Sequence, residues 1–88
     1  MIDQEEVRRM QWAARRGMLE LDLVLEPFVN TRYSDLSDLD RATFQRLMLR
    51  EDQELFSWLL QRAEPEDKEF AAIIEQILKF ARTAPADR

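Results

Sequence analysis

Apolar residues recur at spacings of three and four along most of the chain, and this period predicts amphipathic α-helices rather than strands. Five segments follow the pattern, namely residues 3–17, 18–31, 37–51, 52–60 and 65–82. Because the connections between them are short, successive helices are expected to be antiparallel neighbours. The pattern therefore predicts an all-α fold, a single compact bundle of about five antiparallel helices.

Residues that favour helix ends mark several of these boundaries. Asp3 is expected to cap the first helix, with Glu6 three residues on in the register of a capping box. Ser37 and Asp52 are expected to cap the third and fourth helices. Gly17 is the only glycine in the chain, and we expect it to end the first helix in a left-handed conformation.

Two prolines modify this picture. Pro27 removes a backbone donor inside the second segment and predicts a kink or an early helix end there. Residues 31–36 are then expected to form a connection, in which the Tyr33 hydroxyl either ties down the loop or faces a partner. Pro65 is expected in the first turn of the last helix.

The apolar residues indicate one core. The fourth segment is nearly apolar all round, which predicts a central helix between neighbours. Aromatic residues at helical spacing are expected to fill the core, and here they are Phe28, Phe56, Trp58 and Phe70. We expect one helical domain over residues 1–82, followed by a flexible tail at 83–88 that has too little apolar surface to dock.

Composition removes several classes of function. The chain of 88 residues has no cysteine and no histidine, which excludes disulfides, thiolate nucleophiles and imidazole acid–base chemistry, so we expect no enzyme and no metal site. A net charge of −5 argues against binding to nucleic acid. No apolar run approaches the roughly 20 residues of a membrane span, and the N-terminal residues are acidic. These features predict a cytoplasmic protein without membrane insertion.

Residues 15–22 combine unusual features. Arg15 and Arg16 precede Gly17, and the carboxylates Glu20 and Asp22 follow it. Positions that depart from the local sequence preferences of their element are often functional. These five residues are therefore candidates for binding a charged protein partner. Nothing in the sequence indicates that the two carboxylates are buried as an acid–base pair, so catalysis is not assigned to them. The alternative is that these charges form a solvated surface or intramolecular ion pairs.

Trp12 is a sixth candidate for partner binding. On a helical wheel it lies opposite the apolar stripe of the first helix, together with Arg8, Arg15 and Arg16. Tryptophan and arginine are enriched among interface hot spots. Trp12 can therefore anchor a partner, or it can cover an edge of the core.

The string Arg16-Gly17-Met18-Leu19-Glu20 resembles the Arg-Gly-x-x-Glu signature of the SdhE family of succinate dehydrogenase assembly factors. The resemblance extends over nearly the whole chain, through residues 12–22, 27–28, 33, 36–37 and the Asp-x-x-Leu-Phe-x-Trp-Leu pattern at 52–59. It implies a five-helix protein that binds the flavoprotein subunit of succinate dehydrogenase, and often that of fumarate reductase. It also implies that the protein assists covalent attachment of FAD to that subunit.

The resemblance also implies roles for particular residues. Arg16, Gly17 and Glu20 match the family motif that meets the flavoprotein, and Arg15 and Asp22 extend the matching string. In the family, FAD becomes attached to a histidine of the partner, and this chain has no histidine. We therefore expect no stably bound cofactor in this chain, which is expected to be a monomer when free.

Two mechanisms and one alternative function follow. The protein can bind the flavoprotein conformer that reacts with FAD and so shift its population, because only differential affinity moves such an equilibrium. It can instead bind free FAD and deliver it. The alternative function is that of an antitoxin-like regulator, in which the acidic helical surface neutralises a protein target.

Overall fold

The computed structural model describes residues 2–84 and 86. In this part of the chain the elements are five α-helices and one short 3₁₀ helix: α1 (Gln4–Ala13), α2 (Leu19–Arg32), η1 (Tyr33–Asp35), α3 (Asp38–Leu47), α4 (Asp52–Leu59) and α5 (Lys68–Arg82). The prediction of an all-α bundle is confirmed.

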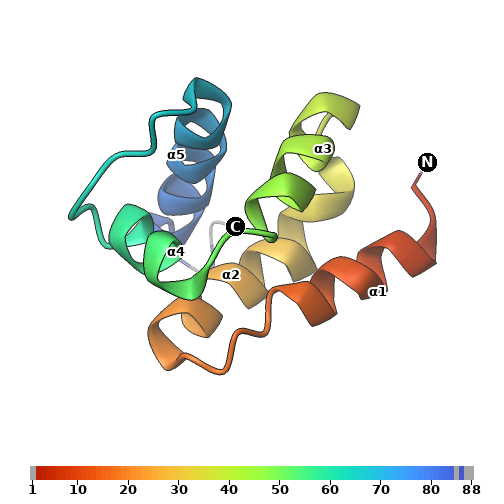
Figure 1. Cartoon of the computed structure of the whole chain (residues 1–88). Coiled ribbons are helices and arrows are strands. Elements are labelled where there is room, and N and C mark those ends of the chain that lie inside the picture. Colours follow the sequence, from red (N-terminus) through yellow and green to blue (C-terminus); the bar gives the residue numbers. More distant parts are fainter. Residues whose placement is uncertain (1, 85, 87–88) are drawn as a thin grey trace.

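The helix α2 lies at the centre of the arrangement, where it contacts α1, α4 and α5. In Figure 1, α1 and α2 run along the base, while α3 and α5 rise above them. Two side-chain pairs show that α1 and α2 are antiparallel. Gln11 on α1 pairs with Asn30 near the end of α2, and Arg15, just beyond α1, pairs with the earlier residue Glu26.

A single cluster of buried side chains joins these helices. Among the aromatic residues of this cluster, Phe28 on α2 contacts two other rings. Its ring centroid lies 5.8 Å from that of Phe44 and 5.7 Å from that of Phe80. Tyr33 packs against Phe44 from the other side. Phe70 is also buried, as predicted, whereas Phe80 was not among the aromatic residues that the pattern assigned to the core. Burial of these rings and of the aliphatic stripes removes apolar surface from water, which stabilises the bundle.

A kink or an early helix end was predicted at Pro27, and of these two alternatives the early end is wrong. The helix α2 continues past Pro27 to Arg32, and η1 follows directly. Buried residues on both sides of the proline, Leu25 and Phe28, hold the helix against the core. Tertiary packing therefore overrides the local cost of one missing backbone hydrogen bond.

Tyr33 is fully buried, which confirms the alternative that its hydroxyl ties down the connection. Its hydroxyl donates to Oε2 of Glu6 at 2.8 Å and accepts from the Gln45 side-chain amide at 2.8 Å. Burial is the main cause that raises the pKa of Tyr33 to about 12. This residue ties η1 to α1 and α3.

The helix caps agree with the sequence in two cases. Asp3 accepts from the backbone N–H of Glu5, and Ser37 accepts from the backbone N–H of Asp40. The expected capping-box role of Glu6 is wrong, because its carboxylate is engaged by Tyr33 and by Arg41 instead.

Two other expected helix starts are displaced. The cap of α4 is Glu51, which forms a reciprocal capping box with Glu54, so Asp52 is the first helical residue rather than the cap. Asp67 caps α5, and Pro65 lies before the helix rather than in its first turn. Both errors reflect several acidic residues close together, any of which satisfies the preference for a negative group near a helix start.

The helix α4 is less enclosed than predicted. Only Leu55 and Leu59 are buried within it, while Phe56 and Trp58 are half-buried. The helix packs against α2 and α5 along one side, which leaves the remaining apolar positions at the edge of the molecule.

The last helix, α5, ends at Arg82. Thr83 is the C-cap of α5, and its hydroxyl donates to the carbonyl of Lys79 at 2.8 Å. The predicted flexible tail, 83–88, includes residues 85, 87 and 88, which lie outside the described residues. No helix in the described part of the chain is long and apolar enough to span a membrane.

Candidate functional site

The turn between α1 and α2 contains three of the six sequence-predicted site residues, Arg15, Arg16 and Gly17, while Trp12 lies on α1 and Glu20 and Asp22 lie on α2. The helix α1 ends at Ala13 with Ala14 as its C-cap, and α2 begins at Leu19. Gly17 has φ +77°, so its left-handed conformation is confirmed. It lies three positions beyond the C-cap, however, and therefore shapes the turn rather than ending the helix directly.

Arg16 is folded into the molecule. Only 15% of its side chain is exposed, and Nε lies 2.7 Å from Oδ1 of Asp52. Nη1 donates to the carbonyls of Ala13 at 3.0 Å and Met48 at 2.8 Å, and Nη2 donates to the carbonyl of Arg50 at 2.9 Å. We call this set of contacts the Arg16 clamp.

Electrostatics explains why a guanidinium is favourable at the position of the Arg16 clamp. The last carbonyls of a helix have no partner within the helix and carry partial negative charge, so a cation that donates to them is favourable. Ala13 ends α1, Met48 is the C-cap of α3, and Asp52 begins α4. One guanidinium therefore holds three helix ends together, which a planar fork of five N–H donors can do and a lysine ammonium cannot.

Asp22 completes the turn from the other side. Its Oδ1 accepts from the backbone N–H of Arg16 at 2.8 Å, which links the turn to the first part of α2. The backbone of Arg16 is therefore fixed by α2, while its side chain is fixed by α1, α3 and α4. Both residues have a structural role in the free protein.

The other candidates are exposed. The Glu20 carboxylate makes no hydrogen bond or ion pair with any residue that the structure describes. The Trp12 side chain is 76% exposed, so the alternative that it covers the core edge is wrong. Arg15 forms an exposed ion pair with Glu26 at 3.4 Å. An ideal Cβ added to Gly17 would meet nothing within 4 Å, so the space above the glycine is open.

The predicted grouping of Trp12 with arginines holds only in part. Trp12 shares a shallow, open depression with Glu5, Arg8 and Arg9 on the outer face of α1. Arg16 is not on this face, because α1 ends before it and the helical wheel no longer applies.

The residues missed by sequence reasoning belong to the connection between α3 and α4. Asp52 and the carbonyls of Met48 and Arg50 are the partners of Arg16, at sequence separations of 32 to 36 residues. No local periodicity reveals contacts at that distance. Asp52 lies among other acidic residues, Glu51 and Glu54, so its sequence context does not single it out as the partner of Arg16.

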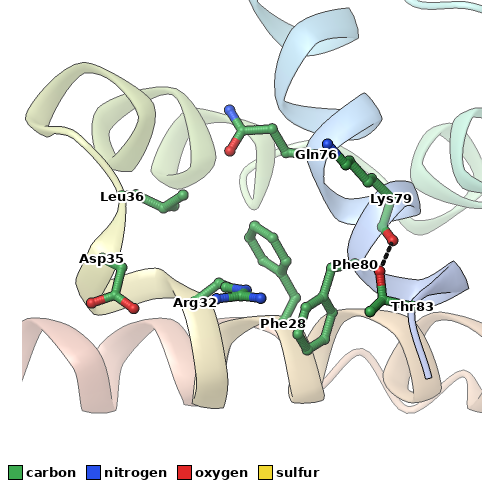
Figure 2. Close-up of a pocket in the computed structure, with 8 residues that line it drawn as sticks. All are labelled: Phe28, Arg32, Asp35, Leu36, Gln76, Lys79, Phe80 and Thr83. Atoms are coloured by element: carbon green, nitrogen blue, oxygen red, sulfur yellow. Dashed lines mark hydrogen bonds between the residues drawn. The ribbon is translucent and has the colours of Figure 1, made fainter. Parts of the chain in front are cut away.

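Figure 2 shows a separate open pocket formed by the last part of α2, η1 and α5. Phe28 and Phe80 supply its apolar surface, and Arg32, Asp35 and Lys79 supply charges. It contains none of the candidate residues and lies toward the opposite end of α2 from Gly17. Among residues 2–84 and 86, no group of three or more acidic side chains is placed to hold a metal ion.

These features define a class of protein. Small-molecule sites are generally concave and converge several polar groups, whereas this site is an exposed turn braced from within and flanked by a tryptophan. The arrangement is typical of a small helical protein that binds another protein through a rigid surface.

Comparison with known proteins assigns the chain to a family. Residues 8–81 match the family described as "Flavinator of succinate dehydrogenase", and the chain belongs to this family. It is 47% identical to the FAD assembly factor SdhE of Pseudomonas savastanoi pv. phaseolicola over 78 residues, which cover 89% of this chain and 93% of that protein. The FAD assembly factor SdhE of Pseudomonas aeruginosa is 46% identical over 89% of this chain and 93% of its own length. That of Shewanella oneidensis is also 46% identical, over 90% of this chain and 94% of its own length.

Proposed function

We propose that this protein is an assembly factor that binds the flavoprotein subunit of succinate dehydrogenase and promotes covalent attachment of FAD to it. Membership of the family, with high identity over nearly the full length, is the observation that carries the proposal. The flavoprotein of fumarate reductase is a second partner under the same proposal. The protein acts as a monomer and as a binding factor rather than as an enzyme.

The geometry divides the candidate residues into two groups. Arg16 and Asp22 brace the turn from within, because their polar atoms are engaged by other parts of the same chain. Trp12, Gly17 and Glu20 face solvent and are available to a partner. We assign direct contact to this second group and include Arg15, whose exposed pair with Glu26 costs little to break.

Gly17 has a particular role in this proposal. Its φ of +77° favours glycine, and the open space above it allows a partner backbone to approach closely. Glu20 lies one turn along, with a carboxylate that has no partner among the described residues. An exposed carboxylate at the start of a helix is a fitting partner for a cation on the flavoprotein.

The proposed mechanism is selection of a reactive conformer. Flavin attachment requires the isoalloxazine ring to be held against an acceptor side chain, with stabilisation of the negative charge that develops on the ring. This chain has no histidine, so the acceptor belongs to the partner. A rigid, braced turn that binds one flavoprotein conformer better than others raises the population of that conformer.

The test uses purified apo-flavoprotein subunit, FAD and this protein. Covalent flavin is read as fluorescence of the flavoprotein band on a denaturing gel, with and without this protein. A faster rate or higher yield in its presence supports the proposal, and an unchanged time course would refute it. Titration of free FAD into this protein alone separates the two mechanisms, since micromolar binding would favour delivery over conformer selection.

A further inference from the structure

The connection between α3 and α4 exposes a large apolar side chain beside the Arg16 clamp. The helix α3 ends at Leu47 with Met48 as its C-cap, and α4 begins at Asp52. Leu49, the first residue after the cap, is 84% exposed, which is more than any other large apolar side chain in the described residues.

The backbone around Leu49 is held firmly. The carbonyls on either side, those of Met48 and Arg50, both accept from the Arg16 guanidinium, at 2.8 and 2.9 Å. The N–H groups of Leu49 and Arg50 donate to carbonyls in the last turn of α3, at 3.1 and 3.0 Å. The loop is therefore fixed on both sides of a side chain that is largely exposed to solvent.

The charged neighbours of Leu49 are also fixed. Arg50 pairs with Glu54 at 2.7 Å, and its guanidinium lies 6.0 Å from the centre of the Trp58 ring. These contacts turn the Arg50 side chain toward α4, so it is engaged there rather than free to cover Leu49. A single exposed leucine is common on protein surfaces and needs no explanation by itself. The notable feature is that the same guanidinium braces this loop and the turn that carries Gly17.

We propose that Leu49 is an apolar contact of the surface that binds the flavoprotein subunit, and that Arg16 positions it there. This inference rests on the proposed function and extends its binding surface across the molecule from the α1–α2 turn to the α3–α4 loop. Under this proposal the partner offers an apolar surface to Leu49 and a cationic group to Glu20. Arg16 contacts both the end of α1 and the α3–α4 loop. This shared contact is the observation that assigns Leu49 to the flavoprotein subunit rather than to an unrelated partner.

The first test compares two exposed leucines. Leu49→Ser removes the proposed contact, and Leu39→Ser is the matched control, since Leu39 is 67% exposed and lies near the other end of α3. Both variants should keep the helix content and the thermal midpoint of the wild-type protein. Dissociation constants for the flavoprotein subunit are measured by calorimetry. Leu49→Ser is expected to weaken binding about tenfold, the effect of losing one buried leucine contact, and Leu39→Ser less than about twofold.

The second test asks whether Arg16 acts through Leu49. Arg16→Lys keeps a cation for Asp52 but cannot donate to three carbonyls at once. Arg16→Lys should weaken binding to the flavoprotein subunit in the wild-type background. In the Leu49→Ser background the same substitution should cause a clearly smaller loss of affinity, because the loop contact is already lost. Purely additive effects of the two substitutions would show that Arg16 does not position Leu49. Hydrogen exchange of the loop amides should also become faster in Arg16→Lys.

The outcomes separate this inference from the proposed function. If the wild-type protein fails to bind the flavoprotein subunit, the proposed function fails and this inference with it. If the wild-type protein binds and Leu49→Ser binds as tightly as Leu39→Ser, only the inference on Leu49 fails. Leu49→Gln provides a second polar variant of similar length, and it should weaken binding to the same degree as Leu49→Ser.

Discussion

Nε of Arg16 lies 2.7 Å from Oδ1 of Asp52, which joins the turn after α1 to the first residue of α4 across 36 positions of sequence. The family signature thus begins with a residue that is largely buried in its own molecule. Arg16 of the signature braces the α1–α2 turn from within, while Gly17 and Glu20 are exposed on the surface of the molecule. This division of roles leads to different expectations for substitutions at neighbouring positions.

Replacement of Arg16 should destabilise the fold more than replacement of its neighbour. Arg16→Ala removes the ion pair with Asp52 and leaves carbonyls of α1 and α3 without their donor. We expect a loss of about 2–3 kcal/mol in the free energy of unfolding, as for other hydrogen bonds to charged groups. Urea denaturation measures it. Arg15→Ala is the control and should cost less than about 1 kcal/mol, because its ion pair with Glu26 is exposed.

Substitutions of Gly17 should separate backbone strain from loss of binding. Gly17→Ala and Gly17→Arg both place a Cβ at φ +77°, so each should lower the free energy of unfolding by about 1–2 kcal/mol. Only the arginine fills the open space above the turn. We expect Gly17→Arg to abolish binding to the flavoprotein while most helix content by circular dichroism remains. Equal affinities of the two variants would contradict the close approach proposed at this position.

The buried hydroxyl of Tyr33 should make stability fall at high pH. Burial raises the pKa of Tyr33 from 10.0 to about 12, so the unfolded chain loses this proton at a lower pH than the folded protein does. Stability due to this group is therefore complete below about pH 10 and declines as the pH rises toward 12.

Tyr33→Phe isolates this effect. The variant should be less stable at neutral pH, since Glu6 and Gln45 lose a partner, but its stability should decline less steeply above pH 10. Urea midpoints measured for both proteins at several pH values test the difference. Parallel curves would show that Tyr33 does not titrate differently in the two states.

The cap of α5 should make stability sensitive to acid. The pKa of Asp67 is lowered, chiefly because its carboxylate accepts from the backbone N–H of Glu69 and also from that of Phe70. The stability from this group is present above the ordinary aspartate pKa of 3.8 and is lost as the pH falls through the lower folded value. Asp67→Asn keeps a capping side chain and should remove this part of the acid dependence, seen as thermal midpoints that change less below pH 4.

The helical period of the sequence was sufficient to predict the fold class, because each helix has an apolar stripe facing one core. Asp3 and Ser37 were predictable as caps because capping is local. The continuation of α2 through Pro27 was not, since it depends on core packing around Leu25 and Phe28. Local preferences decide an element only when tertiary contacts do not oppose them.

The candidate site was predictable in location but not in geometry. Gly17 and the charges around it are visible in sequence, and the motif carries the family resemblance. The inward orientation of Arg16 was not visible, because its partners belong to the distant α3–α4 connection. Leu49 was overlooked for the same reason, since an isolated exposed leucine becomes meaningful only when its loop is seen beside the turn.

The central claim is that the exposed face of the braced turn drives flavin attachment, and Glu20 tests it most directly. Glu20→Gln removes one charge from an exposed side chain without a partner in the described residues. Because Glu20 lies in the first turn of α2, the free energy of unfolding should fall by no more than about 1 kcal/mol. Glu75→Gln, at an exposed glutamate on α5, is the control. The measurement is the initial rate of covalent flavin fluorescence in the flavoprotein subunit on a denaturing gel. We expect Glu20→Gln to be slower by about tenfold or more, the loss of one charged contact, and Glu75→Gln to match the wild-type protein. Equal rates for all three proteins would contradict the account.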